Sequence, residues 1–537
     1  MNFSFRHSLA LAAVACAGLS VAPMADAKTF KWANSGDVSS MDPYARQETF
    51  LLTFTSNIYE PLVRRDKELK LEPALAVKWG QIDKNSWFFD LRPNVKFSDG
   101  TPFTAADVVF SINRANGPGS NVNGNFASLK ALKAVGDLRV EVTTLYPDPL
   151  LADKWASIGI MSKVWAEKNN AVQAADMLKN EENFATRNAM GTGPFVLKER
   201  RAGEKTILAA NPTWWDKPVH NLTEVIFTPV PNAATRVAAL KAGDIDMMYE
   251  VPPADTETLK KDANIKVLEG PETRVVYLGF DQERDELLES NVKGKNPYKN
   301  PKVREAMHRS IDVEAIKRTV MRGQSFPTDL MVAPGINGYM KDLDKRPALL
   351  KPDEAKKLLA DAGYPNGFEV GMDCPNDRYV NDEKICQAVV AMLAKIGVKV
   401  NLRAQTRNLY FAKILRKNDL SQGETSFYML GWSPAQTYDV HNVFEALIET
   451  PNKETKKGQF NAGGYSNPKL DALADKMEQE TDKAKRDAEI AEATKLYVDD
   501  FAYIPLHQQA VVWAARKNID LVQPADNSFP LRFVTVK

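Results

Sequence analysis

Apolar and polar positions alternate with two different periods along the chain, most clearly in its second half. A short apolar run at 368–374 predicts a strand, and 382–396 has the three-to-four-residue apolar spacing of an amphipathic helix. A second strand is predicted at 398–403, a helix at 409–416 and a third strand at 426–432. This β-α-β-α-β order predicts a parallel sheet with helical crossovers, and therefore an α/β fold.

The first half alternates shorter strands with turn residues. No repeat of twenty to fifty residues occurs, which argues against solenoids and propellers. The charged segment 469–497 has helical periodicity and predicts a solvated helical pair. Strands are expected at 29–34, 87–91, 140–144, 193–197, 206–209, 224–228 and 245–250, with a helix at 233–242.

The first residues differ from the rest of the chain. A basic start precedes the apolar run 9–21, and small residues at 25–27 suit cleavage. This pattern predicts a signal peptide at 1–27 and a periplasmic protein. A lipid anchor at Cys16 is disfavoured because the apolar run before it is short.

Charge and length narrow the class of protein. The 537 residues carry 70 Lys and Arg against 69 Asp and Glu, a net charge of +1, so no strong field favours nucleic acid or an anionic membrane. At about 150 residues per domain, the length predicts two to four domains.

Catalytic and metal motifs are missing from the sequence. It has no Gly-x-Ser-x-Gly elbow, no His-Glu-x-x-His and no phosphate loop, and its histidines lack metal-ligand spacing. We therefore expect no cofactor, no resident metal and no enzyme activity, and we disfavour a secreted hydrolase.

Two cysteines follow the predicted signal peptide. An even pair in an exported chain favours a disulfide between Cys374 and Cys386. Two buried free thiols are the alternative, because spacing alone does not establish the geometry.

Polar and aromatic residues follow two strands of the predicted parallel sheet. Ligands of open α/β sheets lie beyond the carboxyl ends of the strands. Arg378 follows the first strand, and Trp432, Tyr438, Asp439 and His441 follow the third. We expect these two loops to face each other across a ligand crevice, with Arg378 holding an anionic group.

Several of these residues have ordinary structural alternatives. Asn442 is expected to cap the helix that follows, and Asp439 is an alternative cap. Trp432 and His441 could instead be core residues. Ser39 follows the first strand of the chain and is expected to face the crevice from the other side.

Ordered motifs then give a resemblance that spans nearly the whole chain after residue 28. Together they resemble the peptide- and nickel-type extracellular solute-binding proteins. The motifs are 71–79 (LEPALAVKW), 87–110 (WFFDLRPNVKFSDGTPFTAADVVF), 191–195 (GTGPF), 211–215 (NPTWW), 242–246 (AGDID), 300–306 (NPKVREA), 355–359 (AKKLL) and 362–364 (AGY).

The resemblance implies a two-lobed periplasmic binding protein of type II, in the large peptide-binding subclass, with an extra N-terminal subdomain. Lobe one would comprise 28–278, with the subdomain at about 70–185, and would be completed by 505–537. Lobe two would comprise 279–504. The implied partners are a small peptide-like ligand and the permease subunits of an ABC transporter, and the implied state is a monomer.

Site roles also follow from the resemblance. In dipeptide-binding relatives an Arg after the first strand of lobe two holds the peptide carboxylate, and Arg378 matches it. Their amine-binding Asp corresponds here to Ala435, so ordinary dipeptide binding would need Asp439 instead. Nickel-binding relatives carry Tyr-Asp-Pro-His, which Tyr438-Asp-Val-His441 resembles. The expected ligand is therefore a carboxylate-bearing, peptide-like compound. A metal chelate is the first alternative, and a sensory or chaperone-like receptor is another.

Overall fold

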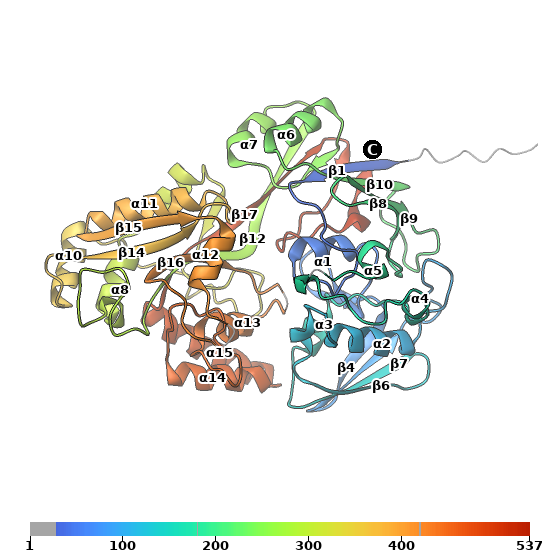
Figure 1. Cartoon of the computed structure of the whole chain (residues 1–537), viewed down its shortest axis with the longest axis horizontal. Helices are drawn as coiled ribbons and strands as arrows, with labels where there is room; N and C mark the ends of the chain where they lie inside the picture. The colour runs from blue at the N-terminus through green and yellow to red at the C-terminus, as the bar shows by residue number, and fades with distance from the viewer. Residues whose placement is uncertain (1–27, 180, 418–419, 436) are drawn as a thin grey trace, which may run out of the picture.

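The computed structural model describes residues 28–179, 181–417, 420–435 and 437–537 (Figure 1). The predicted signal peptide, with Cys16, lies outside the described residues. Within those ranges no helix has the length and apolar character needed to cross a membrane.

One eleven-stranded sheet extends through both lobes of the molecule (Figure 1). Two long strands join the lobes, and they pair antiparallel with each other. In spatial order the strands are β15 (Val398–Gln405), β14 (Phe368–Pro375), β16 (Phe427–Trp432), β12 (Ile265–Phe280), β17 (Tyr503–Arg516), β11 (Met247–Met248), β1 (Thr29–Asn34), β10 (Glu224–Pro229), β9 (Lys205–Ala210) and β8 (Phe195–Arg201), with β13 (Ser325–Pro327) beside β17.

Lobe two has the predicted β-α-β-α-β order. Strand β14 pairs in parallel with β15 and with β16, which confirms the parallel sheet expected from the sequence. Helix α11 (Asp382–Ala394) buries Ile385, Cys386, Val389 and Leu393 against this sheet, which is the spacing of one helix face. The chain then reverses at Gly397, whose φ of 88° suits glycine.

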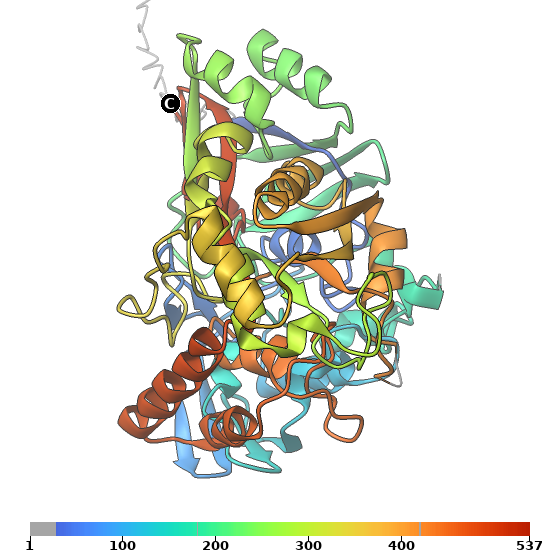
Figure 2. The ribbon, with the colours of Figure 1, turned by 90° about the vertical axis from the view of Figure 1, so that its left-hand side faces the viewer.

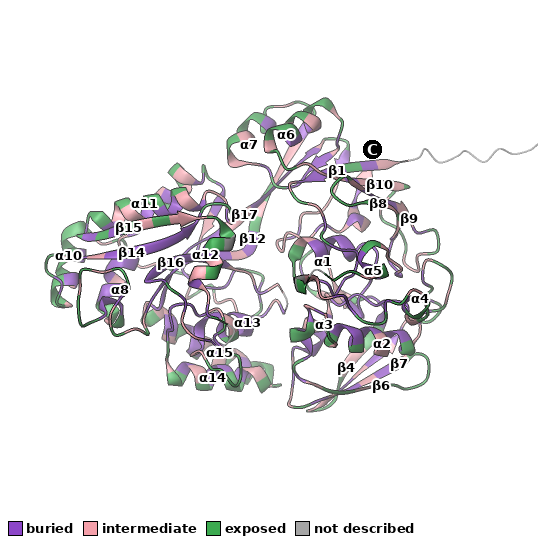
Figure 3. Cartoon of the chain, viewed as in Figure 1, coloured by how far each residue is buried: buried purple, intermediate pink, exposed green. Residues whose placement is uncertain are grey.

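Both faces of the lobe-two sheet are covered. In β12, Val276, Leu278 and Phe280 enter one core, whereas Val275 and Tyr277 enter the other. Because strand side chains alternate between faces, an unbroken apolar run indicates helices on both sides. Figure 2 shows these helices around the sheet, and Figure 3 shows the strands buried and the outer helix faces exposed.

The N-terminal part adds a separate antiparallel sheet with its own apolar core. Its strands are β4 (Ala76–Asp83), β5 (Ser86–Leu91), β7 (Arg139–Thr144) and β6 (Leu129–Ala134), in that order. Two small ladders pair β2 (Val63–Arg65) with β3 (Leu71–Pro73), and β18 (Ile519–Asp520) with β19 (Thr535–Val536).

Helices cover these sheets and connect their strands. They are α1 (Thr49–Thr55), α2 (Ala105–Asn116), α3 (Leu151–Trp155), α4 (Lys163–Lys168), α5 (Phe184–Arg187), α6 (Ala233–Ala242), α7 (Pro253–Lys260), α8 (Pro301–His308), α9 (Val313–Ala315), α10 (Pro352–Asp361), α12 (Arg407–Ile414), α13 (His441–Val443), α14 (Pro468–Gln479) and α15 (Lys483–Asp499).

The pairing of the crossing strands β12 and β17 is irregular at two places. The first lies between Pro271 and Val275, and the second lies between Val276 and Tyr277. Arg274 lies in the first break, at the boundary between the lobes. The lobe limits at 278/279 and 504/505 remain proposals, because β12 and β17 run through them without interruption.

Candidate functional site

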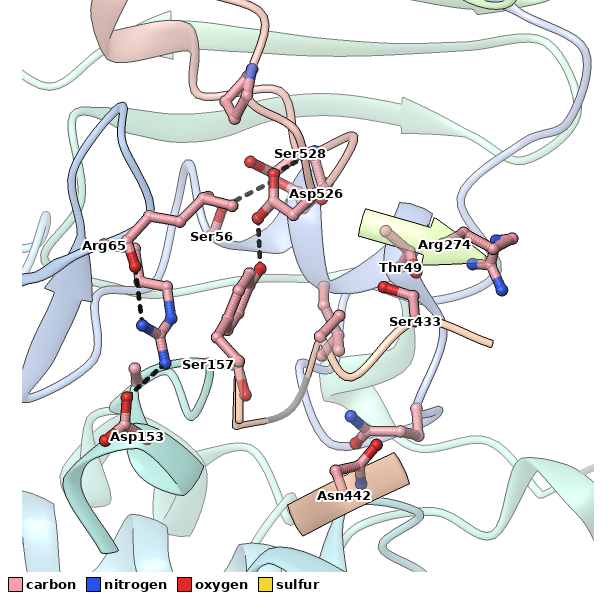
Figure 4. Close-up of a pocket in the computed structure, with 18 of the residues that line it drawn as sticks. Thr49, Ser56, Arg65, Asp153, Ser157, Arg274, Ser433, Asn442, Asp526 and Ser528 are labelled. Carbon is pink, nitrogen blue, oxygen red and sulfur yellow. Dashed lines mark hydrogen bonds and ion pairs between the residues drawn. The ribbon is translucent and has the colours of Figure 1, made fainter. Parts of the chain in front are cut away.

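A cavity of about 850 Å³ lies between the lobes. This volume falls in the range of small-molecule sites, roughly 300–1,000 Å³. Both lobes and the C-terminal segment supply its wall (Figure 4). Its charged lining residues are Glu60, Arg64, Arg65, Asp66, Lys67, Asp153, Arg274, Arg378, Glu445, Lys456, Asp526 and Arg532, and its large aromatic ones are Tyr59, Tyr379, Phe411, Trp432, Tyr438, Phe460 and Phe533.

Arg378 lines this cavity at the carboxyl end of β14. The backbone N–H groups of Arg378 and Tyr379 donate to Asp382 Oδ2 at 2.8 and 3.0 Å, which fixes the turn. A disulfide between Cys374 and Cys386 ties the end of β14 to α11 behind it. The turn that carries Arg378 is therefore anchored at two points.

The Arg378 guanidinium has no carboxylate of its own. Among the described residues, no Asp or Glu forms an ion pair with it, and its nearest ring contact is Tyr379, with the centroid at 4.9 Å. Burial lowers the pKa of Arg378, and the neighbouring positive charge of Arg274 lowers it further. Such an arginine is ready to hold an anionic group of a ligand.

A second guanidinium lies nearby, in the register break of β12. Arg274 pairs with Glu272 at 3.3 Å and donates to the carbonyl oxygen of Gly431 at 3.5 Å. Two carboxylates lie near these two guanidinium groups, because Glu272 pairs with Arg274 and the charge of Glu250 interacts with that of Arg378.

Trp432 stands in the wall where β16 ends. Its indole N–H donates to Asn442 Oδ1 at 2.9 Å, and its ring packs against Phe460 at 4.9 Å. The prediction that Asn442 caps the next helix is wrong, because its side-chain oxygen accepts from Trp432. Both Trp432 and Asn442 line the cavity.

Tyr438 reaches from lobe two into lobe one. Its ring lies under the Arg65 guanidinium, whose central carbon is 3.9 Å from the ring centroid. Its hydroxyl donates to Asp526 Oδ2 at 2.5 Å. The backbone of Tyr438 is left-handed, with φ 52°, a conformation that is sparsely populated for a bulky residue. The Arg65 contact on one ring face and the Asp526 hydrogen bond at the hydroxyl hold it there.

Asp439 does not line the cavity, although the sequence placed it in the wall. It is 1 % exposed and accepts from both terminal nitrogens of Arg486 at 2.8 Å, from Asn337 and from the backbone N–H of His441. Burial alone would raise the pKa of Asp439, but the Arg486 hydrogen bonds and charge lower it below its usual value. Its carboxylate is therefore occupied by the protein, and the expected amine contact is corrected.

His441 is likewise buried and stands outside the cavity lining. Burial lowers its pKa to about 3, so the imidazole is neutral, and within the described chain its Nε2 has no hydrogen-bond partner. No group of three or more His, Cys, Asp or Glu in the described ranges is arranged to hold a metal ion. That His441 contacts a ligand stays a prediction.

Ser39 is also outside the wall. It is exposed, and its hydroxyl donates to Glu48 Oε2 at 3.4 Å. The loop after β1 reaches the cavity through Pro43 and Gln47 and not through Ser39, and α1, β2 and α3 supply further lobe-one lining residues.

Sequence reasoning missed the lobe-one side of the wall. Arg65 pairs with Asp153 at 2.7 Å (Figure 4). It also donates to the carbonyl oxygen of Thr437 across the lobes at 3.3 Å. Asp526 belongs to a C-terminal segment with no motif. These residues lie far apart in the sequence, so no local pattern could have joined them.

Similarity to known proteins identifies the fold and the family of this chain. Residues 70–455, well over half of the chain, match the model of bacterial extracellular solute-binding proteins, family 5, middle region. The chain belongs to this family. The α/β fold of a two-lobed periplasmic binding protein, type II and of the large peptide-binding subclass, is thereby confirmed.

Individual relatives match this family 5 protein over nearly its full length. The glutathione-binding protein GsiB of Escherichia coli K12 is 25% identical over 509 residues, covering 94% of each chain. The structure of HbpA2 from Haemophilus parasuis is 25% identical, with a TM-score of 0.79, and covers 95% of this chain and 100% of that one. The periplasmic binding protein DppA of Helicobacter pylori, in complex with the peptide STSA, is 24% identical with a TM-score of 0.73, covering 95% and 98%.

Proposed function

We propose that this family 5 protein is a periplasmic substrate-binding protein that captures a peptide or peptide-like, carboxylate-bearing molecule between its lobes and delivers it to an ABC permease. The family match and the relatives that bind glutathione and a peptide support a binding role. We further propose that it acts as an exported monomer, without catalysis.

The observation that carries this proposal is the guanidinium of Arg378 in the wall of an interlobe cavity, where no carboxylate of the described residues forms an ion pair with it. A planar guanidinium can donate two parallel hydrogen bonds to one carboxylate. Because the side chain is partly buried, such a bond would form away from bulk water, where it contributes more.

The aromatic wall supports a ligand with an apolar portion as well. Trp432, Tyr379 and Phe411 line the cavity close to the lobe-two strands. Small-molecule sites combine such apolar surface with a few polar groups that set orientation. A short peptide offers both a terminal carboxylate and apolar side chains.

Mass spectrometry of the denatured protein tests the ligand class. We expect a co-purified compound that carries a carboxylate. For that compound, Arg378→Ala should weaken affinity by roughly 2–5 kcal/mol, because a desolvated ion pair is lost. Titration calorimetry on ligand-stripped protein measures the change.

Two variants serve as controls. Lys67→Ala removes an exposed cavity cation and should leave affinity nearly unchanged. Arg378→Lys keeps the charge but not the planar fork and should give an intermediate loss. An affinity of Arg378→Ala within a factor of about two of the wild type, less than ~0.5 kcal/mol, would show that the anion site is elsewhere.

A further inference from the structure

Five acidic side chains of the described residues line the cavity, and two of them are already neutralised. Glu60 accepts from the indoles of Trp214 and Trp215 and pairs with Arg64 at 3.5 Å. Asp153 pairs with Arg65 at 2.7 Å. Asp66, Glu445 and Asp526 form no ion pair with any cation in the described part of the chain.

The three unpaired carboxylates have different surroundings. Asp66 accepts from the backbone N–H groups of Glu68 and Lys70, which closes the turn between β2 and β3. Glu445 is exposed, and the carboxylate of Glu478 adds like charge beside it. Only Asp526 is contacted by a side chain from the opposite lobe.

Asp526 is held in a fixed orientation by two donors. Its Oδ1 accepts from the backbone N–H of Ser528 at 2.9 Å, and its Oδ2 accepts from the Tyr438 hydroxyl at 2.5 Å (Figure 4). Burial raises the pKa of Tyr438 well above its usual value, and the Asp526 charge raises it further, so the phenol keeps its proton and donates it. A carboxylate has about four acceptor positions, so about two remain available toward the cavity.

Neutral donors do not cancel the charge of Asp526. Tyr438 covers part of the carboxylate from lobe two, so Asp526 is half-buried, and within the described chain it gains no cation as an ion-pair partner. A charge in that position favours an incoming cation, because leaving it unpaired costs free energy. Ala435, which also lines the cavity, brings no charge of its own.

Among the described residues that line the cavity, Arg378 and Asp526 thus carry charges of opposite sign on opposite lobes, each without an ion-pair partner. Arg378 belongs to lobe two and Asp526 to the C-terminal segment that completes lobe one, and they are farther apart than the 4.0 Å of an ion pair. Building on the proposed function, we propose that Asp526 binds a cationic group of the ligand, so that the protein selects zwitterions with a carboxylate on Arg378 and an ammonium on Asp526. The Tyr438 hydroxyl positions the Asp526 carboxylate for this contact.

Retention of matched peptide libraries tests the inference. Ligand-stripped wild type is incubated with tripeptides of Ala, Leu, Phe and Ser, or with the same library acetylated at its amino termini, and bound peptides are counted by mass spectrometry. We expect at least about tenfold less retention of the acetylated library, because the charge on the ammonium is lost. Asp526→Asn keeps the shape and should bring the two libraries within about twofold of each other.

Control variants separate the inference from the proposed function. Asp342→Asn, at a fully exposed side chain outside the cavity wall, should keep the wild-type preference, whereas Arg378→Ala should retain neither library. Equal retention of both libraries by the wild type, or an unchanged preference in Asp526→Asn, overturns the role of Asp526. Neither result affects the proposed role of Arg378 as the carboxylate-binding residue. Retention of neither library by the wild type overturns the peptide class, and the inference with it.

Discussion

The carboxylate of Asp439 is held by hydrogen bonds from within the protein. Arg486 holds it with two hydrogen bonds of 2.8 Å, and both side chains are buried. Asp439→Asn leaves the Arg486 charge without its partner, which should cost about 3–5 kcal/mol of unfolding free energy. Urea unfolding at pH 7 measures this loss.

The Asp439 prediction has a pH signature and a control. Because the pKa of Asp439 is lowered in the folded state, its contribution is present above the unfolded value of about 4 and disappears as pH falls through the folded value. The free energies of unfolding of the wild type and of Asp439→Asn should therefore approach each other as the pH falls. Asp342→Asn, at a fully exposed side chain, should change stability by less than ~0.5 kcal/mol. An equally small effect of Asp439→Asn would contradict the structural role.

Strand position predicted some residues of the wall but not their partners. Arg378, Trp432 and Tyr438 line the cavity because the carboxyl ends of parallel strands face a crevice. Asp439 lies beside Tyr438 in sequence, yet its side chain turns away toward Arg486, 47 residues later. One sequence contains no signal for such a long-range pair, so the direction of a loop side chain could not be predicted.

At the scale of elements, the disulfide joins the end of β14 to α11 behind it. Thiol counting on denatured, unreduced protein should find no free cysteine in the exported chain. Cys374→Ala with Cys386→Ala should lower the unfolding free energy by roughly 2–3 kcal/mol and weaken ligand binding, because the Arg378 turn loses one anchor. Two reactive thiols in the unmutated protein would contradict the crosslink.

Strong periodicity made the lobe-two elements predictable. Helix α11 and strand β15 begin at the residues expected, 382 and 398. Strand β12 begins at Ile265, and its first half was not expected to be a strand, because Gly270, Pro271 and charged residues there hide the strand pattern. Pairing with β17 overrides this weak local preference.

At the scale of the whole molecule, Tyr438 ties the lobes together through Arg65 and Asp526. Tyr438→Phe keeps the ring but removes a hydrogen bond to a charged group, which should destabilise the closed form by about 1.5–3 kcal/mol. We expect faster ligand dissociation in stopped-flow measurements. Small-angle scattering should show a smaller decrease in radius on ligand addition than for the wild type.

The control keeps the same chemistry within one lobe. Tyr339 donates to Asp344 at 2.8 Å inside lobe two, so Tyr339→Phe should leave dissociation and closure unchanged. A wild-type radius that stays constant at saturating ligand would count against closure by a hinge at β12 and β17.

The C-terminal segment has a consequence for the order in which the molecule can assemble. Strand β17 lies in the middle of the sheet, and Leu531 donates its backbone N–H to Asn57, 474 residues earlier in the chain. Asp526, Ser528 and Arg532, which follow β17 in the chain, complete the cavity wall. Ribosome-bound nascent chains that end before β17 therefore lack one of the two strands that join the lobes. The capacity to bind should arise abruptly, once β17 and the segment after it have been released and have closed this long loop.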